Sequence, residues 1–245
     1  MLVLQQALQR ISPTNSRQNQ DERLEQGKVV PDHAQWLFNS QSFKDWLQNS
    51  DGFFWVSANA GVGKSVLCAE VIKHLQKTCS LSKAVIAYHY FDYRVPDKRL
   101  YDKFLASIIT HFSETSSECK KVLISTFSQG HIPTTVSRSN LLSLLQSMLS
   151  HHDSKFLVID ALDECMEEDN NRKLLLSYLN DLSKKLVPRN GSLRIFATSR
   201  PLRDIERALL PAHSKVATHR LQLGEEHDHK ATLRTFVDTK LHASA

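Results

Sequence analysis

Apolar residues along the chain fall into short continuous runs separated by longer stretches with a single apolar face. The run FFWV at 53–56 has the length, aromatic content and β-branched content typical of a strand. Comparable runs lie at 84–91, 155–160 and 192–199, and KVATHRLQL at 215–223 is a further candidate. Because the four main runs are apolar throughout, they predict strands that are buried on both faces.

The stretches between these runs carry apolar residues at helical spacing. KSVLCAEVIKHLQK follows the first run, and LYDKFLASIITHF follows the second with six apolar residues on one helical face. Further helices are predicted at 140–149, 171–186 and 202–210. Strands that alternate with helices predict an α/β fold, with a parallel sheet covered by helices on both faces.

The polar and apolar content also suggests how the chain is divided. Residues 1–35 are expected to be a polar lead with a short N-terminal helix, and 12–35 to be a linker, because bulky apolar side chains are scarce there. Residues 36–223 form one predicted α/β domain, which begins with a short helix in WLFNSQSFKDWLQ. A C-terminal helix is expected within 224–245.

The segment SANAGVGKS, between the first strand and its helix, resembles a phosphate-binding loop. The pattern is G-x-x-x-x-G-K-[ST], and strand–loop–helix is the context that it requires. Such a loop turns backbone N–H groups inward around phosphates at a helix N-terminus. The residues expected to contact a nucleotide are Ala58, Asn59, Ala60, Gly61, Val62, Gly63, Lys64, Ser65 and Val66.

Ala58 occupies the position of the first glycine in this pattern. If the position requires a positive φ, alanine costs about 1 kcal/mol there. If the position is strand-like, alanine costs almost nothing. The methyl group removes no ligand, because Lys64 still reaches the β and γ phosphates and the hydroxyl of Ser65 still holds Mg²⁺.

A second candidate element is KFLVIDALDEC, an apolar strand that ends in three acids. Asp160 is placed to hold Mg²⁺, and Glu164, or Asp163 with it, to orient or deprotonate the attacking water. The alternative is an acidic strand-to-helix junction, where carboxylates are favoured for structural reasons. Three acids within five residues directly after FLVI favour the site.

The third element, RIFATSRP, ends a strand in Thr198, Ser199 and Arg200. Its hydroxyls and guanidinium suit a γ-phosphate, which an arginine can sense or stabilise during transfer. An exposed turn before Pro201 with a solvated arginine is an equally good interpretation of these residues alone.

These three elements, in this order, resemble the NACHT-type NTPases of the STAND class, in particular the fungal form with a nephrocystin-3-like N-terminal NTPase domain. The resemblance rests on WLFNSQSFKDWL, FFWVSANAGVGKSVL, KFLVIDALDE and RIFATSRP, and it extends from about Gln35 to about Leu223. The ending D-x-x-D-E of the third strand is its most distinctive part.

The resemblance implies a three-layer P-loop NTPase fold in 36–223, which binds ATP, or less often GTP, with Mg²⁺. It also implies slow hydrolysis, use of the nucleotide as a signalling switch, and protein partners through an effector or self-association. By the same resemblance, Lys64 and Ser65 bind phosphate and metal, Asp160 binds Mg²⁺, Asp163 and Glu164 serve hydrolysis, and Arg200 senses the phosphate.

The family places a helical lid and winged-helix modules after this core. Residues 224–245 are therefore expected to begin a truncated lid region, and the chain to be a fragment, a minimal family member or a truncated product. The missing lid and Ala58 keep a second hypothesis open, a non-catalytic module that binds nucleotide for folding only or not at all. A kinase is less favoured, because no second basic cluster or arginine pair is present for an acceptor substrate.

The composition and charge restrict which classes of binding partner are expected. The net charge of +5 comes from 31 basic and 26 acidic residues without a long basic run, which a nucleotide explains as well as a nucleic acid. A nucleic-acid motor needs basic grooves or aromatic platforms, whereas the aromatic residues here fall on apolar strands and helix faces. No stretch approaches the ~18 apolar residues of a membrane span. We therefore expect no specific nucleic-acid partner and no membrane span.

Cysteines and histidines add no further site. The four cysteines form no CxxC pair and follow no secretory signal, so reduced, buried thiols in a cytoplasmic protein are expected. Cys165 has no histidine placed to activate it and is expected to be a small buried side chain. SHHDS at 150–154 and EEHDHK at 225–230 lack a recognised metal-ligand spacing.

Overall fold

The protein is described here by a computed structural model, which covers residues 2–27, 34–48, 52–79, 84–128, 136–151, 154–185, 192–210 and 217–223. Five strands lie at its centre: β1 (Gly52–Ser57), β2 (Val85–Tyr90), β3 (Ser154–Asp160), β4 (Ser192–Ser199) and β5 (Thr218–Gln222). They form one sheet in the order β2-β3-β4-β1-β5, and every neighbouring pair is parallel. All five predicted strands are confirmed, as is the parallel α/β sheet.

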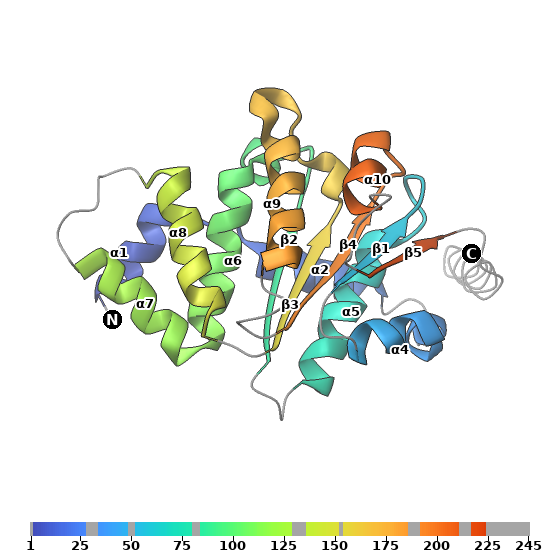
Figure 1. The fold of residues 1–245 in the computed structure, drawn as a ribbon, viewed down its shortest axis with the longest axis horizontal. Helices are drawn as coiled ribbons and strands as arrows, with labels where there is room; N and C mark the ends of the chain where they lie inside the picture. The colour runs from blue at the N-terminus through green and yellow to red at the C-terminus, as the bar shows by residue number, and fades with distance from the viewer. Residues whose placement is uncertain are drawn as a thin grey trace, which may run out of the picture.

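Helices cover both faces of the sheet and make three layers (Figure 1). One face carries α6 (Tyr101–Thr115), α9 (Asn171–Lys185) and α10 (Arg203–Leu209), with α1 (Leu2–Ile11), α7 (Ser117–Ser128) and α8 (Arg138–Leu149) in the same apolar cluster. The other face carries α3 (Gln35–Asn39), α4 (Gln41–Gln48) and α5 (Lys64–Thr78). No helix within the described ranges is long and apolar enough to cross a bilayer.

The apolar runs of β1, β2, β3 and β4 show no alternation because successive residues face two separate cores, one on each side of the sheet. In β1, Phe53 and Trp55 belong to the core beneath α6 and α9, whereas Phe54 and Val56 belong to the core beneath α5. A continuous apolar run therefore predicted its strand correctly without any alternation in the sequence.

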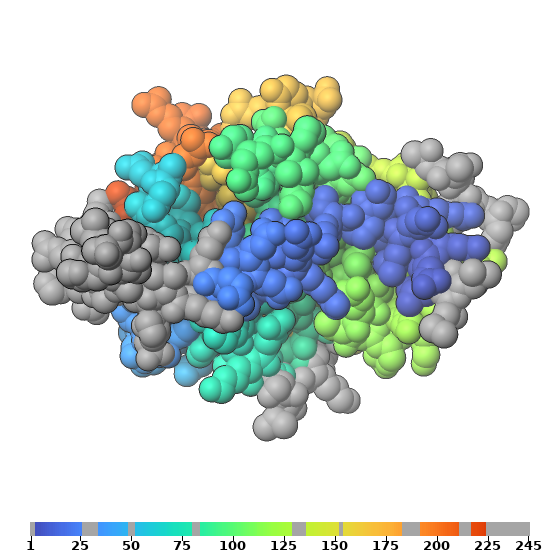
Figure 2. Space-filling view, turned by 180° about the vertical axis from the view of Figure 1, so that it is seen from behind, coloured from blue at the N-terminus to red at the C-terminus, as the bar shows by residue number. Residues whose placement is uncertain are grey.

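The stretch expected to be a linker contains a helix, α2 (Ser16–Gly27), which packs on α5 and β2. Its buried residues within the described part are polar: Ser16, Asn19 and Gln20. The amide of Gln20 donates to the carbonyl of Ala69 in α5 at 2.9 Å and accepts from the hydroxyl of Tyr90 in β2. Figure 2 shows α1 and α2, in blue, running across this side of the molecule. Apolar periodicity could not predict a helix that is docked by amides.

Replacing Gln20 with alanine is expected to lower the free energy of unfolding by about 1–3 kcal/mol, because it leaves the buried hydroxyl of Tyr90 without this acceptor. Gln18→Ala, an exposed change on the same helix, is the matched control and is expected to cost within about 0.5 kcal/mol. Urea unfolding of both variants measures the difference. Equal stabilities would show that the amide of Gln20 does not dock α2.

Two buried histidines predict a loss of stability in mild acid. Burial lowers the pKa of His89 in β2 to about 3 and that of His111 in α6 to about 4, both below the ordinary ~6.5. The unfolded chain therefore takes up protons at these histidines below about pH 6.5, whereas the folded protein does not until about pH 4 or below. The free energy of unfolding is unaffected by them above pH 6.5 and falls by about 2 kcal/mol per histidine by pH 5. Between pH 7 and pH 5, the free energy of unfolding in urea should fall by about 2 kcal/mol less for His89→Leu than for the wild type. An identical loss would contradict this assignment.

Candidate functional site

The loop between β1 and α5 lies at the carboxyl end of the central strands, where parallel sheets bind ligands. Its two glycines have left-handed backbones, with φ of 81° at Gly61 and 87° at Gly63. A Cβ at either glycine would meet no atom within 4 Å, so the backbone conformation and not crowding requires glycine. Gly63 directly precedes the first turn of α5. The predicted strand, glycine loop and helix are all present.

Ala58 continues the strand and does not begin the turn. Its amide donates to the carbonyl of Ser199 at 3.1 Å, its side chain is buried beside α5, and it is not among the described residues with positive φ. The strand-like alternative therefore holds, and alanine costs almost nothing at this position.

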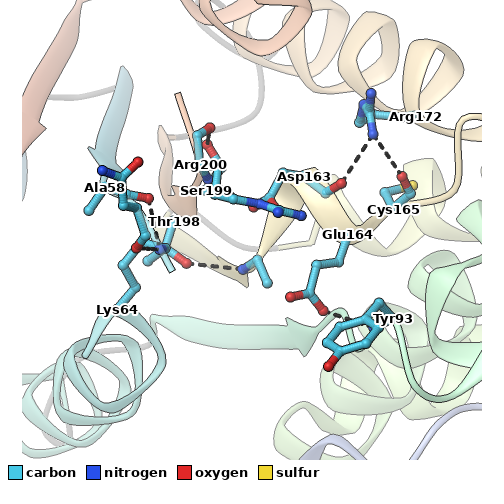
Figure 3. A network of polar contacts seen from close by, with 12 residues as sticks. Ala58, Lys64, Tyr93, Asp163, Glu164, Cys165, Arg172, Thr198, Ser199 and Arg200 are labelled. Carbon is cyan, nitrogen blue, oxygen red and sulfur yellow. Dashed lines mark hydrogen bonds and ion pairs between the residues drawn. The ribbon is translucent and has the colours of Figure 1, made fainter. Parts of the chain in front are cut away.

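The ammonium of Lys64 is folded back across its own loop (Figure 3). It donates to the carbonyls of Ala58 at 2.9 Å and Asn59 at 2.6 Å. Burial lowers the pKa of Lys64, and the carboxylates of Asp163 and Asp160 oppose that shift. The lysine thus lies within the electrostatic field of the acids that the sequence predicted to share its site.

Asp160 lies at the end of β3, which is separated from β1 by β4. The strand that carries Asp160 is therefore not adjacent to the strand that precedes the loop. The hydroxyl of Thr198 in β4 donates to Asp160 at 2.6 Å, and the hydroxyl of Ser65 lies close enough to this carboxylate to act on its pKa. Burial raises the pKa of Asp160, and these two hydroxyls oppose the shift. Asp160 and Ser65 are thus brought together across the sheet.

The hydroxyls of Thr198 and Ser199 already have partners within the protein. Thr198 also accepts from the amide of Ala161 at 3.0 Å. Ser199 accepts from the indole of Trp55 at 2.8 Å and donates to the carbonyl of Arg200 at 2.8 Å. They position Asp160 and the end of β4, a role that neither the phosphate-facing nor the exposed-turn interpretation included.

The donor set at Ser65 and Asp160 fits Mg²⁺. A hydroxyl and a carboxylate are hard oxygen ligands, and Mg²⁺ typically takes only one or two protein ligands besides waters and phosphates. Within the described ranges, no group of three histidine, cysteine or acidic residues is gathered for a metal. Residues 225–230, and His152 and Asp153 of the segment 150–154, lie outside what the structure describes.

Asp163 and Glu164 have different partners, although they are adjacent in sequence (Figure 3). Asp163 is buried and accepts from the backbone amide of Arg200 at 2.9 Å and from its Nε at 2.6 Å. Glu164 is half-buried and accepts from the amide of Tyr93 at 2.8 Å. Burial raises the pKa of Glu164, and the charges of Asp163 and Asp160 raise it further. A raised pKa suits Glu164 to accept a proton.

Arg172, at the start of α9, was missed by the sequence analysis. Its buried guanidinium donates to the carbonyls of Asp163 at 3.1 Å and Cys165 at 3.2 Å, and it pairs with Asp204 at 2.8 Å. Nothing in NRKLLL distinguishes it from an exposed arginine at a helix start. Burial raises the pKa of the Cys165 thiol to about 12, which makes it a poor nucleophile.

Comparison with known proteins identifies the family. Residues 32–200 match the family described as Nephrocystin 3, N-terminal. The chain belongs to this family. This match covers the phosphate-loop segment, the strand that ends in Asp160 and, as its last residue, Arg200. A comparison with curated proteins finds no match.

Solved structures share the fold at low sequence identity. ORC1 of Aeropyrum pernix, in complex with DNA, has a TM-score of 0.50 and 14% identity, over 87% of this chain and 50% of that one. Drosophila ORC bound to AT-rich DNA and Cdc6 has a TM-score of 0.46 and 13% identity, over 96% of this chain and 34% of that one. A. pernix ORC2, in its ADPNP–ADP complexes, has a TM-score of 0.44 and 13% identity, over 84% of this chain and 50% of that one. The chain thus spans about half the length of the Aeropyrum proteins.

The likeness to Aeropyrum ORC1 concerns the fold alone at this identity. Together with the parallel sheet and the helices on both of its faces, it confirms the three-layer α/β fold of the P-loop NTPases.

Proposed function

We propose that the protein binds a nucleoside triphosphate, ATP or GTP, together with Mg²⁺, and hydrolyses it slowly. The observation that supports this is the convergence of Lys64, the hydroxyl of Ser65 and the carboxylate of Asp160 at the carboxyl end of the sheet. These are the three groups that a P-loop requires for phosphate and metal.

Phosphate binding would use the loop backbone and Lys64. The amides at the start of α5 carry the positive end of the helix dipole, and Gly61 and Gly63 leave room for close approach. Lys64 now donates to two neutral carbonyls. A phosphate offers charged acceptors, which form stronger bonds, so Lys64 would exchange one partner set for the other.

The metal would be held by Ser65 and Asp160. When bound, Mg²⁺ would neutralise part of the negative charge on the phosphate oxygens. Thr198 fixes the orientation of the Asp160 carboxylate through its 2.6 Å hydrogen bond, and burial at 2% exposure limits access of bulk water to that carboxylate.

Hydrolysis would use Glu164 as the group that orients and deprotonates water. Its raised pKa favours proton acceptance, and the Tyr93 amide holds one oxygen while leaving the other to water. Arg200 would stabilise the charge on the transferred phosphate. We infer a slow rate, about 10⁻⁴ to 10⁻² s⁻¹, because P-loop proteins without an activating partner turn over in this range.

At the level of biology, we propose a STAND-type, NACHT-like signalling switch in the cytoplasm, with an effector protein or further copies of itself as partners. Membership of the nephrocystin-3 N-terminal family supports the comparison with signalling NTPases. The alternative is a non-catalytic nucleotide-binding or interaction module. Its support is that Lys64, Asp163 and Glu164 all have partners within the protein.

Single-turnover phosphate release tests this proposal. In the presence of Mg²⁺, and with protein in excess over radiolabelled ATP or GTP, we expect complete hydrolysis of the nucleotide at the slow rate above. If the nucleotide binds but is hydrolysed no faster than in the absence of protein, the non-catalytic module is the remaining function. The absence of binding by a folded protein would contradict both functions.

A further inference from the structure

Asp163 and Arg200 form the most complete ion pair of the site. Arg200 donates to Asp163 twice, from its backbone amide at 2.9 Å and from Nε at 2.6 Å, and these bonds use both carboxylate oxygens. The side chain of Asp163 is only 3% exposed, whereas that of Arg200 is 52% exposed. The aspartate is therefore the fixed partner, and the arginine projects from it towards solvent.

Arg172 holds in place both segments that carry this pair. Its guanidinium binds the backbone carbonyls of Asp163 and Cys165, and through Asp204 it reaches the first turn of α10, four residues after Arg200. The short 3₁₀ turn with Asp163 and the first turn of α10, which follows Arg200, are thus tied to one buried cation. A rigid frame of this kind is what a positioning residue needs.

The pair lies within the electrostatic reach of the phosphate loop. The charge of Arg200 acts to lower the pKa of Lys64, and the charge of Asp163 acts to raise it. Figure 3 shows Lys64 on one side of Thr198 and the Arg200–Asp163 pair on the other. The bond to Asp163 occupies Nε, and the two Nη groups of Arg200 have no hydrogen bond to other described residues.

We propose that Asp163 is a positioning residue. It holds Nε of Arg200 so that the two Nη groups face the terminal phosphate, and it thereby sets the preference for a triphosphate over a diphosphate. This inference rests on the proposed nucleotide site and changes the assignment of one acid within it. Asp163 acts through Arg200, whereas Glu164 alone serves the attacking water.

The test is the ratio of dissociation constants for MgADP and MgATP, measured by calorimetry. Asp163→Asn keeps the size of the side chain and an acceptor for the Arg200 amide but removes its charge, and Arg200→Gln removes the guanidinium. Each change should lower the preference for MgATP about tenfold or more, the size expected for loss of a charge-assisted hydrogen bond. MgADP affinity should stay within about twofold, and the double variant should be no worse than either single one.

Two exposed residues nearby give matched controls. Asp169→Asn removes one negative charge at a left-handed position that asparagine tolerates, and Arg203→Gln removes one positive charge at the start of α10. Both should keep the wild-type ratio. If Asp163→Asn does not fold by circular dichroism, Arg200→Lys replaces it, because lysine keeps the charge without the planar fork. Arg200→Lys should lose the preference as Arg200→Gln does.

Three results would overturn the inference while leaving the nucleotide site intact. One is an unchanged ratio in Asp163→Asn, or in Arg200→Lys where that variant replaces it. Another is an additive loss in the double variant, which would show that the two residues act separately. The third is an increased preference for MgATP in Asp163→Asn, which would show that Asp163 competes with the phosphate for Arg200. Failure of the wild type to bind either nucleotide would instead remove the proposed function, and this inference with it.

Discussion

Replacing Lys64 with alanine is expected to weaken MgATP binding by at least about 100-fold. The ammonium lies over the loop, within 2.9 Å of two of its carbonyls, and would exchange these for phosphate oxygens. Two charge-assisted hydrogen bonds at roughly 1.5 kcal/mol or more each correspond to that factor. Titration calorimetry of the variant measures the loss directly.

Lys73→Ala is the matched control for this change. Lys73 lies on the same helix and is exposed, and within the described residues it forms an ion pair only with Glu70, one turn away at 3.7 Å. Removing its positive charge should leave the dissociation constant within about twofold, because exposed charges contribute little at physiological salt. If both lysine variants weaken binding equally, the effect is one of net charge and the loop is not the binding site.

Replacing Glu164 with glutamine is expected to lower the single-turnover hydrolysis rate about 10²- to 10⁴-fold, the usual range for loss of a general base. MgATP affinity should stay within about threefold, because Glu164 is bonded to the Tyr93 amide and is not assigned to phosphate or metal. Glutamine has nearly the same shape and keeps an oxygen for that amide. Phosphate release and calorimetry on the same preparation separate the two effects.

The pH profile gives this prediction a second readout. Since burial and the neighbouring acids raise the pKa of Glu164, the wild-type rate should fall as the pH drops through that raised value, where the carboxylate becomes protonated. Glutamine does not titrate in this range, so Glu164→Gln should lack the acidic limb. A variant with the wild-type rate, or with the same limb, would show that another group activates the water.

The strands and the loop could be predicted from the sequence because their signals are local. Strands such as β1 and β3 are apolar on both faces, and the glycines at 61 and 63 are required by their own backbone conformations. Strand order is different, since it depends on crossovers that no local pattern records. The insertion of β4 between β1 and β3 therefore appeared only in the structure.

The parts that could not be predicted depend on polar contacts over long sequence distances. Helix α2 is docked by Gln20, which joins Ala69 and Tyr90, and a polar helix gives no apolar signal. Arg172 resembles any arginine near a helix start until its carbonyl partners at Asp163 and Cys165 are seen. The proposed C-terminal helix within 224–245 lies outside the described residues and stays a prediction.

The most direct test of nucleotide binding at this loop is a calorimetric titration of the wild-type protein with MgATP. We predict saturable binding at one site per chain, with loss of most of the affinity when Mg²⁺ is removed by EDTA, because we propose that Ser65 and Asp160 hold the metal. No heat of binding from a protein that is folded by circular dichroism would contradict the proposed site.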